Sequence, residues 1–248
     1  MRTLLTQRGG TMKTLKVLSA LLCYPQADMQ VALDEMIEVL DQENVLLQRE
    51  HHALLTLIDQ IRRTDLIELQ ERYVRLFDRG RALSLHLFEH IHGESRDRGQ
   101  AMVNLLDVYR RHGFELDAHE LPDYIPLFLE YLAQRPAEEA LDMLADAMHV
   151  MALLGARLAE QGSDYHVVFD ALATLVGEPT DIEAIRQQAA TEGPDETIVN
   201  MDKIWEEEAV TFLANQDGCG KSQGGRATAQ PVRWVSPPGS TQQAARSL

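Results

Sequence analysis

Apolar residues recur along this chain at the three- and four-residue spacings of an amphipathic helix, whereas the alternation typical of a strand is almost absent. The longest stripe consists of Leu141, Leu144, Met148, Met151, Gly155 and Leu158. A chain with roughly eight to ten helices and no strands must bury its apolar faces helix against helix. We therefore expect an all-α fold, a single helical bundle.

The expected helices are punctuated by residues that favour helix ends. They cover residues 13–23, 28–40, 45–61, 66–77, 102–112, 123–132, 141–158, 165–176 and 182–190. Asp28 and Asp181 fit N-cap positions, and Pro122 fits the first turn of the helix that follows it. Gly80 ends the helix at 66–77, and Gly113 follows Arg110 and two further basic side chains, as at a helix C-terminus.

The pattern changes beyond residue 193. Met201, Trp205, Ala209 and Phe212 lie on one face of a further short helix. From about residue 217 the chain is rich in Gly, Ser, Gln and Pro, which predicts disorder. We expect an N-terminal extension at 1–11, a helical domain at 12–214 and a disordered tail at 215–248, with Met1 or Met12 as the start.

Composition narrows the possible functions. The chain has a formal net charge of −16 over 248 residues. Sequence-independent binding to nucleic acid needs clustered Lys and Arg, so we expect no nucleic-acid partner. The two cysteines, Cys23 and Cys219, form no CxxC pair and no disulfide framework, which argues against zinc-ribbon and iron–sulfur sites.

The N-terminus superficially resembles a secretory signal, because basic residues precede the apolar run at 17–23. That run is at the lower limit of signal length, and no A-x-A-like cleavage site follows it. No later apolar run approaches the roughly 20 residues of a membrane-spanning helix. We therefore expect a cytoplasmic protein with no direct membrane insertion.

Residues 73–100 differ from the rest of this acidic chain. The stretch contains five arginines, four carboxylates and three histidines, which leave it a formal charge of +1. Apolar residues such as Leu85, Phe88 and Ile91 are interspersed among these polar groups. Charged groups brought into partly buried positions must be paired, so we expect a polar network here.

Residues 86–90 also fit H-x-x-E-H, the pattern of inverted zinc peptidases. On a helix, His86 and His90 would face one way, with Glu89 as the candidate base. A third ligand would be needed, and Glu160 stands in a context typical of an exposed helix end. We favour a structural network in which these side chains pair with nearby arginines, and a zinc-dependent hydrolase remains the alternative.

Other catalytic patterns are absent from the sequence. There is no G-x-S-x-G, no phosphate-binding loop after a strand and no dinucleotide-binding glycine pattern. We therefore expect that the protein is not an enzyme and that it carries no cofactor of its own.

Several segments resemble the signature of one family, the nitrate reductase molybdenum cofactor assembly chaperones (NarJ/NarW), within the TorD/DmsD group of redox-enzyme maturation chaperones. The matching segments are 77–81 (FDRGR), 87–102 (LFEHIHGESRDRGQAM), 121–132 (LPDYIPLFLEYL), 152–158 (ALLGARL) and 205–208 (WEEE). The resemblance extends from about residue 12 to residue 212.

This resemblance implies an all-α chaperone that binds the apo catalytic α subunit of a respiratory nitrate reductase, chiefly through that subunit's N-terminal peptide. It implies that the chaperone keeps the subunit competent for insertion of the molybdenum cofactor and iron–sulfur clusters. It also implies that the chaperone delays docking onto the membrane subunit until loading is complete.

A helical bundle without a catalytic constellation suits the binding of an amphipathic peptide in a groove, and an acidic surface favours a peptide with Lys or Arg. We expect client-binding residues of three kinds: apolar lining from Tyr73, Phe77, Phe88 and Phe128; carboxylates Asp78, Glu89, Glu94 and Asp97 that meet basic groups; and Arg79, Arg96, His90 and His92 that fix them. The aromatic residues at helical spacing fit core positions equally well. Since histidine titrates near 6.5, peptide capture could depend on pH.

Overall fold

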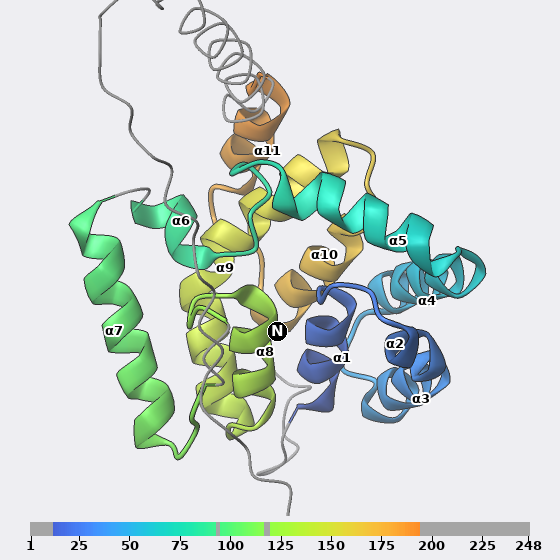
Figure 1. The fold of residues 1–248 in the computed structure, drawn as a ribbon, viewed down its shortest axis with the longest axis horizontal. Coiled ribbons are helices and arrows are strands. Elements are labelled where there is room, and N and C mark those ends of the chain that lie inside the picture. The colour runs from blue at the N-terminus through green and yellow to red at the C-terminus, as the bar shows by residue number, and fades with distance from the viewer. Residues whose placement is uncertain (1–11, 93–94, 117–119, 194–248) are drawn as a thin grey trace, which may run out of the picture. The chain divides into compact units, whose positions relative to one another are not determined.

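A computed structural model of the chain describes residues 12–92, 95–116 and 120–193, and every regular element in these ranges is a helix (Figure 1). The expected all-α fold is thus confirmed for this part of the chain. All described residues belong to the first of two units into which the chain divides, Met1–Ile204. The extension at 1–11, the helix expected at 201–212 and the tail expected at 215–248 lie outside the described residues.

Eleven α-helices and one π-helical turn follow one another along the described residues. They are α1 (Lys13–Leu21), α2 (Ala27–Val31), α3 (Leu33–Glu43), α4 (Gln48–Arg63), α5 (Leu66–Tyr73), η1 (Val74–Asp78), α6 (Leu87–His92), α7 (Arg96–Arg111), α8 (Ile125–Ala133), α9 (Ala137–Glu160), α10 (His166–Val176) and α11 (Ile182–Thr191).

The core forms around α9, the longest helix. It packs against α8, α10 and α11, while α1 packs against α8 and α3, and α10 packs against α4. The stripe predicted on α9 is confirmed, because Leu144, Met151 and Leu158 are fully buried. Burial of such side chains, each stabilising the fold by roughly 1.5–3 kcal/mol, is the main force that holds the bundle together.

Gly155 permits the closest approach between two helices of this core. A Cβ atom added to Gly155 would lie 2.8 Å from Cβ of Phe169 on α10. No real Cβ atom tolerates such a distance from another side-chain stem, so only glycine fits between α9 and α10 at this separation.

Two expected helix starts are wrong. The helix expected at 28–40 is divided into α2 and α3, because α2 buries no side chain and the buried stripe begins only at Leu33. Asp28 lies inside α2, where Gln26 is the N-cap, so Asp28 is not an N-cap. Asp181 does occupy the N-cap of α11, but its side chain makes no capping hydrogen bond.

The other wrong start is that of α8, which begins at Ile125 and has Pro126 in its first turn. Pro122 therefore lies outside the helix. The backbone from Asp123 to Ile125 makes tertiary contacts instead. The amide of Leu87 donates to the carbonyl of Asp123 at 3.0 Å, and the amide of Ile125 donates to the carbonyl of Leu85 at 2.8 Å. These hydrogen bonds satisfy backbone groups that a longer helix would have used.

The helix α7 differs from the others in its burial. It is as long as α4, but among its residues only Tyr109 is buried. Figure 1 shows it at the edge of the fold, beyond α6. Its predicted end is confirmed, since Gly113 follows with a φ of +80°, a conformation that glycine adopts readily.

The helix expected at 66–77 is interrupted near its end. It is regular to Tyr73 and continues as the π-helical turn η1, after which Gly80 lies in an irregular segment. Asp65 caps its start by accepting a hydrogen bond from the amide of Ile67 at 2.9 Å. Among the described residues, no helix is long and apolar enough to cross a membrane.

Candidate functional site

A cavity of about 660 Å³ opens beside η1 and the irregular segment that follows it. We call residues 79–86 of that segment the cavity loop. The lining residues are Tyr24, Tyr73, Phe77, Asp78, Arg79, Gly80, Arg81, Ser84, Leu85, His86, Glu89, Glu120 and Tyr124. They come from the segment after α1, from the end of α5, from η1, from the cavity loop, from α6 and from the approach to α8.

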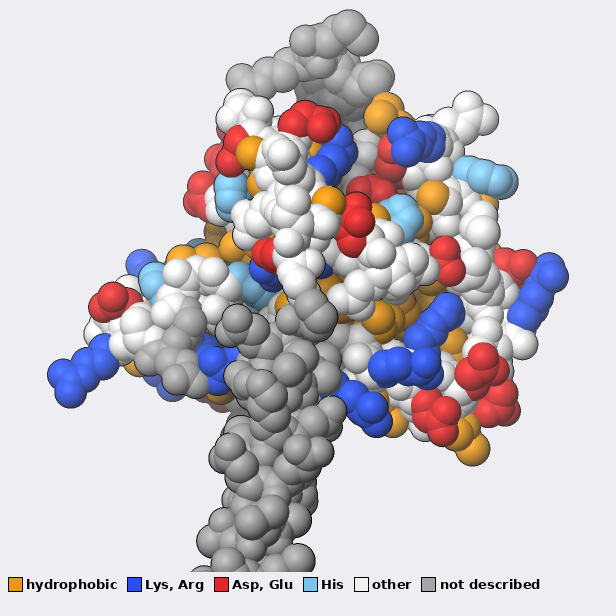
Figure 2. Space-filling model, turned by 90° about the horizontal axis from the view of Figure 1, so that it is seen from above, with side chains coloured by type: hydrophobic (Ala, Val, Ile, Leu, Met, Phe, Trp, Pro, Cys, Tyr) orange, Lys and Arg blue, Asp and Glu red, His pale blue; other side chains and the backbone are white. Residues whose placement is uncertain are grey.

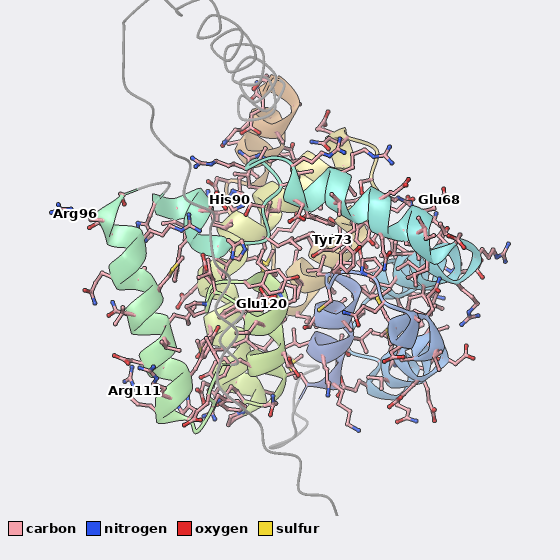
Figure 3. All side chains as sticks on the ribbon, viewed as in Figure 1. Glu68, Tyr73, His90, Arg96, Arg111 and Glu120 are labelled. Carbon is pink, nitrogen blue, oxygen red and sulfur yellow. The ribbon has the colours of Figure 1, made fainter. Side chains whose placement is uncertain are left out.

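Aromatic rings form the apolar wall of the cavity. The ring of Tyr73 packs edge-to-face on Tyr24 at 5.5 Å and against Phe77 at 4.9 Å between centroids. Its hydroxyl donates to the carbonyl of Leu22 at 3.0 Å and lies 3.1 Å from the hydroxyl of Tyr124. These contacts fix Tyr73 where the end of α5 meets the rest of the bundle (Figure 3).

The hydroxyls of Tyr73 and Tyr124 stay protonated in the physiological pH range. Burial raises the pKa of Tyr73 far above its ordinary value, and burial raises the pKa of Tyr124 to about 12. These two residues therefore contribute ring surface and neutral hydroxyl groups to the wall.

Charged groups surround the aromatic wall. Asp78, Arg79 and Glu120 are exposed, and none of them forms an ion pair or a side-chain hydrogen bond with another described residue. Figure 2 shows the same mixture on the upper face as a whole, where acidic and basic side chains are interspersed with apolar ones. Charges of both signs that have no partner among the described residues thus face a ligand in the cavity.

Among the carboxylates that line the cavity, Asp78, Glu89 and Glu120, the least exposed is Glu89. Its Oε2 accepts a hydrogen bond from the hydroxyl of Ser84 at 2.5 Å, and its Oε1 lies 3.6 Å from Nε of Arg81. Only 17% of the side chain is exposed. Hence Glu89 is held in place by the cavity loop while it still faces the cavity.

A buried carboxylate, Asp123, joins the cavity loop to the start of α8. Its Oδ2 accepts a hydrogen bond from the amide of Phe88 at 3.0 Å, and its Oδ1 lies 3.4 Å from Nδ1 of His86. Burial by itself would raise the pKa of Asp123, but these hydrogen bonds outweigh it and hold the pKa below its ordinary value. The negative charge of Asp123 is therefore kept in the interior by its partners.

His90 joins the cavity loop to α9. Its Nε2 lies 2.8 Å from the carbonyl of Ser84, and its Nδ1 lies 3.4 Å from Nη1 of Arg157. A carbonyl accepts and a guanidinium donates, so the ring is neutral with its proton on Nε2. Burial lowers the pKa of His90, and the charge of Arg157 lowers it further.

The zinc-dependent alternative fails on this geometry. His86 precedes α6 instead of lying on it, so the two histidines do not share a helix face. One ring faces Asp123 and the other faces Ser84 and Arg157. In the part of the chain that the structure describes, no three His, Cys, Asp or Glu side chains are grouped as metal ligands.

The structure brings together some of the side chains expected at the site. Those that line the cavity are Tyr73, Phe77, Asp78, Arg79 and Glu89. Those that lie outside its lining are Phe88, His90 and His92 on α6, Arg96 and Asp97 at the start of α7, and Phe128 in the core. Arg96 is at the outer end of α7, far from the centre of the fold (Figure 3). Glu94 lies outside the described residues.

Sequence reasoning missed several residues of the site. Tyr24, Ser84, Glu120 and Tyr124 line the cavity, and Asp123 supports it. For Asp123 a signal existed, since a single carboxylate inside the apolar run at 121–129 must find a partner if it is buried. Nothing comparable marks Tyr24, Glu120 and Tyr124, because they reach the cavity only through the tertiary fold, and Ser84 is a small polar residue with no pattern around it.

A second cavity of about 640 Å³ lies next to the first and shares Tyr24 and Arg79 with it. Its lining is completed by Ile67, Gln70, Glu71, Val74 and Arg75, which lie on one face of α5 and η1. Ile67 is 66% exposed, so this face carries apolar surface in contact with water.

Comparison with known proteins shows the family. The sequence model of the family described as nitrate reductase delta subunit matches residues 27–171. The chain is 46% identical over 208 residues to the nitrate reductase molybdenum cofactor assembly chaperone NarJ of Escherichia coli (strain K12), covering 84% of this chain and 88% of that one. It is 39% identical over 213 residues to NarW of the same strain, covering 85% and 89%.

Among solved structures, a redox enzyme maturation protein from Archaeoglobus fulgidus is similar with a TM-score of 0.48 and 20% identity. The match covers 75% of this chain and 98% of that one.

Proposed function

The chain belongs to the nitrate reductase delta subunit family, and we propose that it is a chaperone that binds the apo catalytic α subunit of a respiratory nitrate reductase, mainly through the N-terminal peptide of that subunit. Family membership confirms the expectation from the sequence that the chain is an assembly chaperone and not an enzyme. The proposal extends this to the client segment and to the surface that receives it.

The observation that carries the proposal is the cavity beside η1. It lies within the stretch whose sequence resembles the family signature most closely, at 77–81 and 87–102. It combines four aromatic rings with exposed charges of both signs, and a site of a few hundred cubic ångströms suits one or two side chains of a peptide.

The chemistry of the lining indicates what the client segment presents. Tyr24, Tyr73 and Phe77 offer ring surface to an apolar or cationic side chain. Asp78, Glu89 and Glu120 offer carboxylates to Lys or Arg. We therefore propose a client peptide with apolar anchors next to a basic residue.

The second cavity extends this surface along α5. Because the two cavities share Tyr24 and Arg79, an amphipathic helix longer than one turn could contact both. The apolar side of such a helix would cover Ile67 and Val74, of which Ile67 is otherwise largely exposed to water.

Occupation of this surface explains how the chaperone serves assembly. A captured N-terminal segment is withheld from other contacts, so the α subunit stays competent in the cytoplasm for insertion of the molybdenum cofactor and iron–sulfur clusters. Docking onto the membrane subunit is delayed for as long as the segment is held. Release returns the chaperone unchanged, because no covalent step is involved.

Isothermal titration calorimetry of the purified protein with a synthetic N-terminal peptide of the α subunit tests the proposal. We expect saturable one-to-one binding, and no binding of a scrambled peptide with the same composition. Failure of the peptide to bind, under conditions where the N-terminal peptide of a different molybdoenzyme does bind, would assign the chain another client.

Two matched variants locate the site in the same experiment. Glu89→Gln removes a charge inside the cavity, and Asp97→Asn removes one at the start of α7, outside its lining. We expect the first to weaken binding by about three- to tenfold and the second to change it by less than about twofold. Equal effects would place the peptide elsewhere.

A further inference from the structure

The cavity loop is the part of the site with the least regular structure. It connects Asp78 at the end of η1 to Leu87 at the start of α6 and contains no helix. A segment of this kind takes its shape from contacts with surrounding elements, since its own backbone hydrogen bonds do not form a repeating ladder. One such contact is at its end, where Leu85 accepts a hydrogen bond from the amide of Ile125 at 2.8 Å.

The middle of the cavity loop is held by one side chain of α9. Nη1 of Arg157 donates to the carbonyl of Ala82 at 2.9 Å. The same nitrogen lies 3.4 Å from Nδ1 of His90, whose Nε2 donates to the carbonyl of Ser84 at 2.8 Å. Arg157 thus holds one loop carbonyl directly and a second through the neutral tautomer of His90.

The rest of the guanidinium is held from the opposite side, by the last described turn of the chain. Nε and Nη2 of Arg157 make a two-pronged ion pair with Glu192, at 2.6 and 2.7 Å. Glu192 is the C-cap residue of α11. The hydrogen bonds from Arg157 hold the pKa of Glu192 below its ordinary value.

The two partners differ in exposure, since Arg157 lies largely out of solvent whereas Glu192 is an exposed residue. Only 15% of the Arg157 side chain is exposed, compared with 31% of the Glu192 side chain. Two-pronged, charge-assisted hydrogen bonds fix direction as well as distance. If Glu192 were removed, the guanidinium of Arg157, which lies largely out of solvent, would lose its carboxylate partner and the contact that fixes its direction, so the loop contact depends on both residues.

We infer that Arg157 is a positioning residue for the client cavity: it holds the cavity loop in its binding shape, and Glu192 at the end of α11 anchors it. Neither residue lines the cavity. The end of α11 therefore belongs to the recognition machinery, although it touches no client. This inference rests on the proposed function for its effect on binding, but its effect on the loop can be measured without a client.

Four variants of the full chain test the inference. Arg157→Gln removes the charge and the three-nitrogen fork, Arg157→Lys keeps the charge without the planar fork, and Glu192→Gln leaves Arg157 in place. Arg186→Gln is the matched control, because Arg186 pairs with Glu178 at 2.7 Å and Glu183 at 3.0 Å on the exposed side of α11. All four are measured without peptide and with the α-subunit N-terminal peptide.

Without peptide, amide hydrogen exchange of residues 79–86 reports the shape of the loop. We expect exchange to be faster by about tenfold or more in Arg157→Gln and Glu192→Gln, and unchanged in Arg186→Gln. With peptide, we expect the dissociation constant to rise by about tenfold in Arg157→Gln and by several-fold in Arg157→Lys and Glu192→Gln. Arg186→Gln should bind as the wild type does.

If Arg157 and Glu192 only stabilised the fold, the variants would give a different result. In that case Arg157→Gln and Glu192→Gln would lower the melting temperature while the folded fraction kept wild-type loop exchange and affinity, and this would overturn the inference. If Arg157→Gln does not fold, the loop exchange and affinity of Glu192→Gln decide between the positioning role and the merely structural role. If the wild type fails to bind the peptide, the proposed function fails, whereas loop exchange still tests the role of Arg157.

Discussion

The interior of the bundle and the wall of the cavity are stabilised by different kinds of interaction. In the bundle, α9 packs against α8, α10 and α11 through apolar side chains such as Leu144 and Leu154, which are fully buried. In the wall, Asp123 accepts a hydrogen bond from α6 and Arg157 donates one to the cavity loop. Apolar burial has little directional preference, whereas these hydrogen bonds specify positions atom by atom.

The two regions should therefore respond differently to substitution. A change in the bundle removes burial free energy that the whole unit shares, and the position of the wall should survive it as long as the protein is folded. A change in the wall removes a contact of modest net free energy, but one that fixes the position of a cavity residue. Stability and client affinity should thus separate between the two regions.

The largest expected effect on stability comes from the bundle. Leu154→Ala, at a fully buried position of α9, should lower the free energy of unfolding by about 2–5 kcal/mol, since the truncation leaves a cavity. Denaturant titration measures this. At a temperature where the variant is folded, its affinity for the client peptide should stay within about twofold of the wild type. A large loss of affinity in the folded variant would remove the distinction between the regions.

Val31→Ala is the control for this experiment, because Val31 is 84% exposed on α2. Its free energy of unfolding should change by less than about 0.5 kcal/mol.

A smaller effect on stability is expected in the wall. Asp123→Ala leaves the amide of Phe88 without an acceptor in a buried place, which should cost about 1–3 kcal/mol. Because Asp123 positions the start of α6 against the approach to α8, we expect affinity for the peptide to fall by about tenfold in the folded protein. A variant that is destabilised but binds normally would show that the wall tolerates displacement.

The pH dependence of stability should include a contribution from His90. Its pKa is lowered in the folded protein, so the unfolded chain takes up a proton at about pH 6.5, before folded His90 does. The contribution of His90 to stability is complete above that pH and is lost as pH falls through the folded pKa. Besides Arg157, the groups that act on this ring are the carbonyl of Ser84 and the side chains of Glu89, His86 and Glu192.

Melting temperatures between about pH 7 and about pH 5 measure this contribution. We expect a decrease in the wild type and a shallower decrease in His90→Gln, where Gln can still donate to the carbonyl of Ser84. Identical slopes would mean that other groups carry the pH dependence.

The smallest effect on stability is expected at the exposed charges of the cavity. Glu120→Gln should leave the free energy of unfolding within about 0.5 kcal/mol of the wild type, since Glu120 has no partner among the described residues. The same change should slow association with a basic peptide by about two- to fivefold at low salt, and less at high salt. Stopped-flow measurements at two ionic strengths would test both statements.

The same contrast explains what could be predicted from the sequence. The bundle follows from hydrophobic periodicity, so the stripe on α9 was found residue by residue, with Leu144, Met151 and Leu158 buried as expected. Helix starts were less predictable, because tertiary contacts decided them. At α8, the hydrogen bonds from Leu87 to Asp123 and from Ile125 to Leu85 replace the first turn that Pro122 suggested.

The candidate site was predictable in part, through charge density and family resemblance. Those signals located Tyr73, Phe77 and Glu89, which share one segment of sequence. They could not locate Tyr24 or Arg157, since no local pattern shows that the segment after α1 and the last turn of α9 meet that segment. Phe128 fitted both a core and a lining position, and the structure places it in the core.

The family signature at 87–102 does not contribute to the cavity along its whole length, because α7 lies apart from the cavity. The run at 87–102 spans both α6 and the start of α7, but only its first part contributes to the cavity lining. Arg96 and Asp97 lie on a helix that buries little besides Tyr109.

The central claim is that the client peptide occupies the cavity beside η1. Chemical-shift mapping of the labelled protein during titration with the α-subunit N-terminal peptide tests it most directly. The account predicts the largest perturbations at residues 73–89 and 120–124, with the amides of α7 changing little. Perturbations concentrated at 96–111 and absent from the cavity loop would contradict it.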